Sequence, residues 1–470
     1  MRPSQFYRRR PSLLTDLYQL TMASAFVSSG RSERRAVYHL TFRRAPFGGS
    51  WMAVCGLGPL LEAVDTLAFD TDDLEYVASL EGAEGRPLFG PEFLRWLEGF
   101  RFEGAIDAMP EGSIGFPGEP VLRVEGGLAE CQMLETLMLN QVNYASAIAT
   151  KAARVCHVAA EGEPVLEFGL RRAPGIGGGV AASRAAWIGG CRATSNLMAG
   201  RVVDIPVRGT HAHSWVMAFE DEIEAFRAYA RAMPHNSVLL VDTYDTQRGV
   251  ERAIQVAREM RAEGAELGGL RLDSGDLLEL SLWAREKLDT EGFPEVRIVA
   301  SGGLDELTVA ALRRAGAPID VWGVGTRIVA AGDGIDGVYK LSLLESDDGR
   351  WLRRMKATDD PRKASLPGRL QVGRVSDDGS MCNDTLYDLS LPGADEVGGQ
   401  PLLEPFVRDG EVLSMPEERE ARDRLKSEVD RLPEEVRSLE NPQPFPVRLH
   451  PELEESVERA RAALDDDGAG

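Results

Sequence analysis

The sequence predicts an α/β protein with a (β/α) barrel in the middle of the chain and a mixed α+β domain at the N-terminal end. Three observations lead to this prediction. Short apolar runs alternate with helical stretches between residues 165 and 326. Before residue 130, short alternating segments are separated by turns rich in Gly and Pro. After residue 330 the alternation fades, and we expect the remaining segments to complete the N-terminal domain.

The N-terminal domain is expected to cover residues 1–130. AVYHLTF (36–42) predicts a strand, and residues 111–127 predict short strands joined by tight turns. Residues 128–155 carry apolar side chains at helical spacing without a Gly or Pro. This stretch therefore predicts one long buried helix.

The barrel domain is expected to cover residues 131–335. Strands that alternate with helices of this length form βα units and a parallel sheet. Six units of similar spacing favour a barrel over an open sheet. The six expected strands lie within residues 164–170, 201–210, 237–246, 268–276, 296–303 and 319–326.

The C-terminal part is expected to cover residues 336–470. VYKLSLLE (338–345) and RWLRRMKAT (350–358) predict strands outside the barrel. Residues 415–470 are rich in charge and predict helices that pack back on the N-terminal domain.

The composition argues against several classes of function. The chain has 470 residues and a formal net charge of −22. Nucleic acids and anionic membranes both need basic patches, so neither is expected as a partner. No segment approaches the ~20 apolar residues that cross a bilayer, and the N-terminus lacks the apolar run of a signal peptide. The five cysteines are scattered without a C-x-x-C pair, so we expect reduced thiols in a cytoplasmic protein.

Polar or small residues stand where each expected barrel strand ends. In a barrel these ends share one face, and that face carries the active site. We therefore expect the following residues to lie together: Arg171, Arg172, Thr210, His211, His213, Asp242, Asp245, Arg271, Asp273, Asp276, Ser301, Gly302, Gly303, Gly323, Val324, Gly325 and Thr326.

Two of these strand ends are rich in glycine. SGG (301–303) and GVGT (323–326) follow the last two strands, where small residues let backbone N–H groups approach an anion closely. Late-strand loops of barrels are a frequent phosphate site. The two ends together favour a phosphorylated substrate, although each alone also fits an ordinary tight turn between a strand and a helix.

GLRLDSGDL (269–277) places a cation and a carboxylate on one face, because Arg271 and Asp273 are two residues apart on a strand. They form either a structural ion pair at the barrel rim or a functional pair. In the functional case Arg271 would bind an anionic substrate, and Asp273 would bind a ribose hydroxyl or a magnesium-bound diphosphate.

GTHAHSW (209–215) brings two of the six histidines close together. His211 and His213 could hold a metal ion, could be core residues, or could include one nucleophile that accepts a phosphoryl group. A metal site needs further ligands at later strand ends. None of the other four histidines ends a recognisable barrel strand: His39, His157, His235 and His450.

Seven motifs, taken in this order, resemble those of the nicotinate phosphoribosyltransferase family. They extend over nearly the whole chain: LLTDLYQLTM (13–22), EFGLRRA (167–173), GTHAHSWV (209–216), VDTYDT (241–246), RLDSGDL (271–277), SGGLDE (301–306) and GVGT (323–326). Most are weak singly, but the joint pattern is highly specific. The resemblance implies an irregular α/β barrel joined to the mixed N-terminal domain, and a homodimer with active sites at the subunit interface.

The resemblance also implies a reaction. In this family nicotinate and phosphoribosyl pyrophosphate (PRPP) give nicotinate mononucleotide and pyrophosphate, a salvage step of NAD biosynthesis. ATP is the co-substrate and is hydrolysed through a phosphohistidine, and Mg²⁺ is the cofactor. By motif position His213 resembles the phosphorylated residue. His211 stands where the family tolerates other residues, so it is interpreted as a neighbour.

The other site residues come from the same resemblance. Tyr18 of the partner subunit and Phe168 resemble the aromatic side chains on either face of the pyridine ring, where stacking adds ~0.5–1.5 kcal/mol. Asp273 resembles the partner of the ribose or of magnesium, which is not fixed by the protein alone. The groups expected near the nicotinate carboxylate and the PRPP phosphates are Arg171, Thr210 and Arg271. The residues expected to hold phosphate are Ser301, Gly302, Gly303, Gly325, Thr326 and Ser365.

Three alternatives stay open on the sequence. The first is a relative that takes nicotinamide or quinolinate. The segment CRATSNLMAG offers Thr194, Ser195 and Asn196 but no carboxylate to hold an amide, which favours an anionic pyridine. The second is a metal-dependent barrel hydrolase that uses His211 and His213. The third is a catalytically inactive barrel that only binds its ligand.

Overall fold

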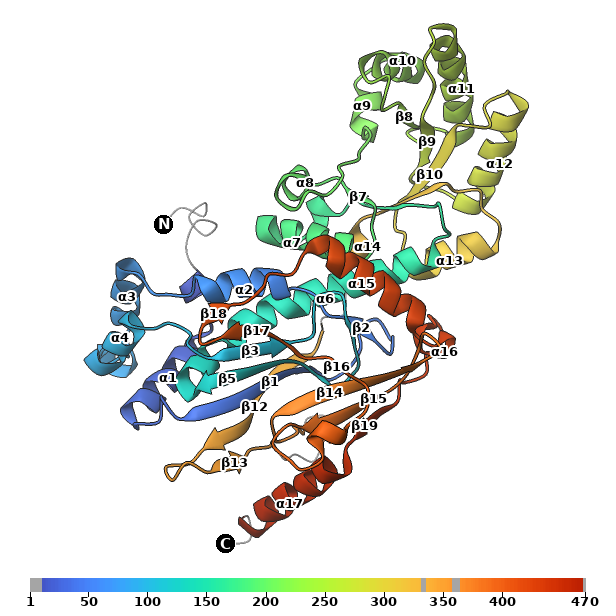
Figure 1. Ribbon diagram of the computed structural model, residues 1–470. Helices are drawn as coiled ribbons and strands as arrows, with labels where there is room; N and C mark the ends of the chain where they lie inside the picture. The colour runs from blue at the N-terminus through green and yellow to red at the C-terminus, as the bar shows by residue number, and fades with distance from the viewer. Residues whose placement is uncertain (1–10, 331–334, 357–363, 468–470) are drawn as a thin grey trace. The chain divides into compact units, whose positions relative to one another are not determined.

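The computed structural model describes most of the chain, namely residues 11–330, 335–356 and 364–467. The chain divides into two compact units (Figure 1). The first unit contains Met1–Ala147 and Asp333–Gly470, and the second contains Ile148–Gly332. The division falls within helix α6 (Glu135–Val158). Residues 131–147, which were predicted to belong to the barrel domain, therefore lie in the first unit.

The first unit combines segments from both ends of the chain. Its N-terminal elements are α1 (Leu17–Ser28), β1 (Arg35–Phe42), β2 (Met52–Ala53), α2 (Leu57–Asp65), α3 (Thr71–Ala78), α4 (Pro91–Glu98), β3 (Ala105–Ala108), β4 (Ile114–Gly115), β5 (Pro120–Gly127) and α5 (Leu128–Met133). Its C-terminal elements are β12 (Gly337–Glu345), β13 (Trp351–Arg353), β14 (Leu370–Asp377), β15 (Ser380–Asp388), β16 (Gln400–Pro401), β17 (Glu404–Arg408), β18 (Glu411–Val412), α15 (Glu418–Arg431), α16 (Glu434–Arg437), β19 (Val447–Leu449) and α17 (Pro451–Asp467).

The strands of the two chain ends share one sheet. Its order is β13-β12-β1-β5-β3-β17-β18, and the C-terminal strands β12 and β17 pair antiparallel with β1 and β3 (Figure 1). Across the first of these pairs, Tyr38 stacks on Tyr339 with ring centroids 4.8 Å apart. The C-terminal residues thus complete the N-terminal sheet. They also form a second sheet of their own, in the order β16-β14-β15-β19.

One N-terminal element differs from the expectation. Residues 128–155 were predicted as a single helix, but α5 ends at Met133 and α6 begins at Glu135. The break follows from hydrogen bonding, because the Leu134 N–H donates to the Cys131 carbonyl, a contact one residue tighter than in an α-helix. Across the described residues, no helix is both long enough and apolar enough to cross a membrane.

The second unit alternates strands and helices. Its elements are β6 (Val165–Glu167), α7 (Gly175–Ile188), β7 (Ala193–Thr194), α8 (Leu197–Val203), α9 (His213–Met217), α10 (Glu222–Ala232), β8 (Val238–Leu240), α11 (Thr246–Ala262), β9 (Gly269–Leu272), α12 (Leu277–Thr290), β10 (Arg297–Ser301), α13 (Glu306–Arg314), β11 (Val321–Val324) and α14 (Thr326–Val329). The strands form one parallel sheet in the order β7-β6-β11-β10-β9-β8. Helices α11, α12 and α13 connect its successive strands (Figure 1).

Five of the six predicted barrel strands are confirmed as β6, β8, β9, β10 and β11. The strand predicted for residues 201–210 is wrong, because Arg201–Val203 instead end helix α8. The side chain of Asn196 caps this helix by accepting the N–H groups of Met198 and Ala199. Beyond the helix, Val207 forms only an isolated parallel bridge with Thr194.

The ring expected of a barrel has a seam between Val207 and β8. Strand pairing runs from β8 through the sheet to β7 and on to Val207. Within the described part of the chain, no ladder joins Val207 to β8. The parallel sheet is thus consistent with the barrel prediction, but closure by strand pairing is not seen.

Candidate active site

The carboxyl ends of β8, β9 and β10 bring four predicted or neighbouring polar groups into one chain of contacts. His213 begins helix α9, and its Nδ1 lies 3.1 Å from the Thr243 hydroxyl. Its Nε2 lies 4.0 Å from Asp273 Oδ2. The Ser301 hydroxyl donates to the other oxygen of Asp273 at 2.5 Å. His213 is therefore held on one side and faces a carboxylate on the other.

Asp242 holds the turn that carries Asp273. Its Oδ2 accepts the backbone N–H of Asp273 at 3.0 Å and the hydroxyl of Ser274 at 2.5 Å. These bonds fix the turn that follows β9, and with it the carboxylate of Asp273. Asp242 was predicted at a strand end, without a role of its own.

Two buried polar atoms at these strand ends lack hydrogen-bond partners within the described part of the chain. They are Asp242 Oδ1 and Arg271 Nε. Arg271 uses Nη1 to donate to the Thr210 hydroxyl. Burial lowers the pKa of Arg271, while Asp273 and Asp242 oppose that shift. Unpaired buried groups are rare in native proteins and are typical of sites that a ligand or an ordered water completes.

The glycines of the predicted phosphate loops lie at the ends of β10 and β11. These strands are neighbours, with Ser301 opposite Gly323. A Cβ atom on Gly323 would come within 2.9 Å of the Phe168 ring, and one on Gly325 within 3.0 Å of the Phe168 carbonyl oxygen. Side chains at either position would displace Phe168, so glycine keeps the aromatic ring against the strand end.

Gly302, which follows β10, lies very close to the backbone of Asp273, which follows β9, and a substitution there tests this close approach. Its φ is +91°, and a Cβ atom would lie 1.9 Å from the Asp273 carbonyl oxygen. We expect Gly302→Ala to lower the free energy of unfolding by roughly 2–4 kcal/mol, from backbone strain plus the clash. Gly303→Ala is the matched control, because φ is +68° but nothing lies within 4 Å of its Cβ; it should cost only ~1 kcal/mol. Equal losses in urea unfolding would contradict the close approach.

Phe168 and Arg171 follow β6 in a loop that a buried carboxylate holds. Glu167 is 1% exposed. Its Oε1 accepts the Gly169 N–H, and its Oε2 accepts the hydroxyls of Ser183 at 2.9 Å and Thr194 at 2.6 Å. No sequence motif had indicated a role for Glu167. The signal was a glutamate on the same strand face as Val165, where an apolar side chain is expected.

The segment around Thr194 was interpreted from its composition as part of a site for an anionic pyridine, but its contacts lie within the fold. Thr194 and Asn196 are buried, and both bond to Ser183 within the Glu167 network. Their polar groups are therefore engaged inside the fold. The inference of an anionic substrate from these side chains receives no support from the structure.

Two of the strand-end aspartates are helix caps. Asp245 accepts the N–H of Arg248 at the start of α11, and Asp276 accepts the N–H of Leu278 at the start of α12. Both keep the usual role of aspartate at an N-cap. Arg171 and Arg172 lie exposed in the short turn Leu170–Arg172, where their guanidinium groups are accessible.

His211 is not arranged as a metal ligand with His213. It is 8% exposed, and its Nε2 accepts the N–H of Leu240 at 3.1 Å. Burial lowers the pKa of His211 to about 4, with Arg271 and His213 acting in the same direction. Across the described residues, no group of three or more His, Cys, Asp or Glu side chains could hold a metal ion. The described residues therefore give no support to the hydrolase alternative.

Tyr18 belongs to the first unit, on helix α1. Gln19 of that helix donates to Glu135 of α6 and accepts from Gln132 of α5, and Thr136 of α6 donates to Asp16, the residue before the helix. Tyr18 stays 47% exposed. Partial burial, Glu135 and Asp16 raise its pKa. Helix α1 is thus held by hydrogen bonds while the Tyr18 ring remains accessible at its surface.

Ser365 also belongs to the first unit. Its hydroxyl accepts the N–H of Lys356 at 2.8 Å. The predicted phosphate contact of Ser365 stays a prediction.

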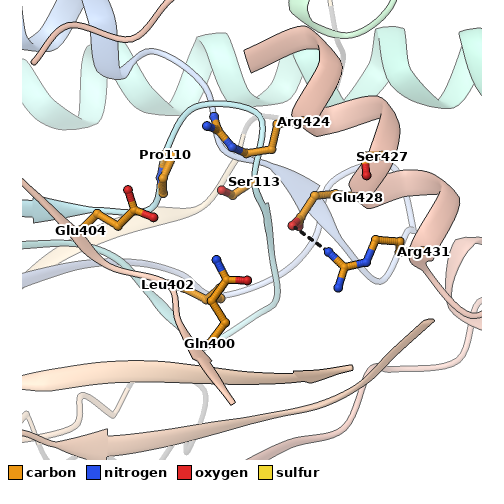
Figure 2. A pocket seen from close by; sticks show the side chains of 9 residues that line it. All are labelled: Pro110, Ser113, Gln400, Leu402, Glu404, Arg424, Ser427, Glu428 and Arg431. Carbon is orange, nitrogen blue, oxygen red and sulfur yellow. Dashed lines mark ion pairs between the residues drawn. The ribbon is translucent and has the colours of Figure 1, made fainter. Parts of the chain in front are cut away.

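The first unit also contains a polar cavity, whose lining residues all lie outside the second unit that carries the strand-end cluster. Figure 2 shows its walls, which come from α15, the segment around β16 and β17, and the turn before β4. Three of its four charged side chains have partners. Glu428 accepts from Arg374 at 2.9 Å and pairs with Arg431 at 4.0 Å, and Arg424 donates to the Glu111 carbonyl oxygen. Because these charges are satisfied within the fold, this cavity is a weaker candidate than the strand ends.

Comparison with known proteins identifies one family along the chain. The models of the nicotinate phosphoribosyltransferase N-terminal and C-terminal domains match residues 13–143 and 395–457. Nicotinate phosphoribosyltransferase pncB2 of Mycobacterium tuberculosis is 41% identical over 457 residues, which cover 96% of this chain and 94% of that protein. The Bacillus subtilis nicotinate phosphoribosyltransferase is 42% identical over 367 residues, which cover 77% and 73%.

A solved structure agrees with this assignment. The crystal structure of human nicotinic acid phosphoribosyltransferase matches with a TM-score of 0.81 and 30% identity, over 95% of this chain and 99% of that one. Similarity at this level over nearly the full length of both chains is decisive for membership. The chain belongs to the nicotinate phosphoribosyltransferase family.

Proposed function

We propose that the protein is an ATP-coupled nicotinate phosphoribosyltransferase of NAD salvage. It would transfer the phosphoribosyl group of PRPP to nicotinate and release pyrophosphate. The observation that carries the proposal is the 41% identity over 96% of the chain. The contacts among His213, Asp273 and Ser301 at the strand ends support it, because the residues expected from the family's motifs are adjacent.

His213 is the proposed phosphoryl acceptor. When Nδ1 carries the proton and donates to Thr243, the Nε2 lone pair is left free as the nucleophile. Nε2 then attacks the γ-phosphorus of ATP, the bond to the bridging oxygen breaks, and ADP leaves. Water later hydrolyses the N–P bond and releases phosphate. The side chain of His213 is 39% exposed, so both reactants have access to the ring.

Magnesium fits the carboxylates beside this nucleophile. Asp273 lies 4.0 Å from His213 Nε2, where its charge would repel an incoming phosphate by roughly 1–4 kcal/mol. Asp242 adds an oxygen without a partner in the described part of the chain. Mg²⁺ is commonly held by one or two carboxylates together with substrate phosphates. When bound, it would neutralise phosphate charge; Asp273 and Asp242 are the residues that would hold it.

Nicotinate is proposed to lie against Phe168, with Tyr18 of the partner subunit on its other face. Arg271 and Thr210 are joined by a hydrogen bond, and Arg171 is exposed in the same loop as Phe168. These cationic and hydroxyl groups suit a carboxylate. The homodimer is part of this proposal, because Tyr18 would come from the partner subunit.

The phosphates of PRPP are proposed to bind at the ends of β10 and β11. The residues concerned are Ser301, Gly302, Gly303, Gly325 and Thr326, and Ser365 is a further proposed contact. Gly302, Gly303 and Thr326 are exposed at these ends, which leaves the backbone accessible to an anion. We further propose that the protein acts in the cytoplasm, in line with its scattered cysteines.

The test is a product assay. Purified protein with nicotinate, PRPP and Mg²⁺ should form nicotinate mononucleotide, and the rate should rise when ATP is added. Nicotinamide or quinolinate should give little product in parallel reactions. A preference for either of them would favour that alternative, and no product from any pyridine would contradict the proposed function.

A further inference from the structure

His211 closes the seam of the parallel sheet on the side of the candidate site. Strand β8 is the edge of the sheet, and the Leu240 N–H points away from β9. No strand ladder reaches it within the described residues. The His211 imidazole takes the place of a backbone carbonyl and accepts this N–H at 3.1 Å. Leu240 is fully buried, so water is not an alternative acceptor.

The imidazole is itself held in one orientation. Its Nδ1 lies 3.3 Å from the Ala212 carbonyl oxygen, which fixes the proton on Nδ1 and leaves Nε2 as the acceptor. The Tyr229 ring packs edge-on with centroids 4.6 Å apart. The charged or titratable groups around it are Tyr229 from α10, Arg271 from β9 and His213 from α9. Neutral His211 is the form that can make this set of contacts.

The residues on either side of His211 contact the candidate site. The Thr210 hydroxyl accepts from Arg271 and donates to the His211 carbonyl oxygen. Two residues after His211, the His213 ring meets Thr243 and Asp273. The hydrogen bond from the Leu240 N–H to His211 therefore anchors a segment with Thr210 on one side and His213 on the other.

We propose that His211 is a positioning residue: its hydrogen bond to the Leu240 N–H holds segment 209–213 on β8 and so places His213 for phosphorylation. The proposal rests on the proposed function for its second half. His211 does not touch the reacting atoms and acts only through the backbone of this segment.

Two substitutions separate the acceptor from the bulk of the ring. In His211→Gln the amide oxygen can occupy the position of Nε2, whereas in His211→Asn the shorter side chain ends near Nδ1. The first reading is hydrogen exchange of the Leu240 amide. It should stay protected in H211Q and exchange on the order of tenfold faster in H211N. Equal exchange in the wild type and H211N would overturn the proposal.

The second reading is the rate with and without ATP. H211N should lose a larger fraction of the ATP-stimulated rate than of the rate without ATP, because Thr210 of the same segment also contacts Arg271, and H211Q should restore the stimulation. Parallel loss of both rates, or H211Q behaving like H211N, would overturn the positioning role. If the wild type itself formed no product, the proposed function would fail, and Leu240 exchange would still decide whether His211 closes the seam.

The third reading is stability against pH. The pKa of His211 is lowered from 6.5 to about 4 in the folded protein, so its contribution to stability is present above pH 6.5 and is lost as the pH falls towards 4. The urea midpoint of the wild type should therefore fall more steeply than that of H211Q between these values. Parallel midpoints over this range would contradict a neutral acceptor at position 211.

Discussion

Replacing His213 by alanine is expected to abolish the stimulation of nicotinate mononucleotide formation by ATP. The rate with ATP should fall to the rate without it, because the imidazole is the proposed phosphoryl acceptor while Arg271, Asp273 and Ser301 stay in place. Stability should change by less than ~1 kcal/mol, since the side chain is 39% exposed. Steady-state rates with and without ATP, beside urea unfolding, measure both effects.

The matched control for this variant is His235→Ala, which removes an exposed histidine from the loop before β8. It should leave the ATP stimulation intact. Stimulation that persisted in H213A would place the phosphoryl acceptor elsewhere. Loss of stimulation in both variants would point to a general effect of removing histidine in this region.

Replacing Glu167 by alanine is expected to give a large loss of stability. The change strands three buried donors, the Gly169 N–H and the hydroxyls of Ser183 and Thr194. Each unpaired buried group costs about 1–3 kcal/mol, so we expect a loss of roughly 3–5 kcal/mol after the hydroxyls reorient. Because Phe168 follows Glu167 directly, the KM for nicotinate should also rise.

Glu167→Gln is the control, because it keeps a carbonyl acceptor of the same length. It should lose less stability than the alanine variant and keep a KM closer to the wild type. Urea unfolding and nicotinate titration of the initial rate check the pair. Unchanged stability of Glu167→Ala would show that the network does not hold the loop after β6.

The strands of the second unit were predictable because buried parallel strands are short apolar runs that end in glycine or a polar residue. β8, β9, β10 and β11 all have this form. The run at Arg201–Val203 imitates it but is a helix. Its apolar, β-branched residues predict a strand, and the Asn196 cap, five residues earlier, decides otherwise. The β propensity of Val202 and Val203 at the end of α8 was outweighed by the hydrogen-bonded cap at the start of that helix.

The candidate site was predictable only as a set of strand ends. Asp245 and Asp276 have the same residue type and position as Asp242 and Asp273, yet they cap helices. A side chain at the start of a helix and one at a reactive centre are alike in sequence, because both follow a strand and both use aspartate. Only the partners of each oxygen separate them. Likewise, the network of Glu167 joins residues far apart in the chain, which no local pattern reveals.

The most direct measurement is transfer of labelled phosphate from γ-³²P-ATP to the protein, followed by peptide mapping. We expect an acid-labile, base-stable label on the peptide that contains His213. The label should disappear when nicotinate and PRPP are added, as nicotinate mononucleotide forms. A label on another residue, or product formation with ATP hydrolysis but no labelled His213, would contradict a phosphohistidine at position 213.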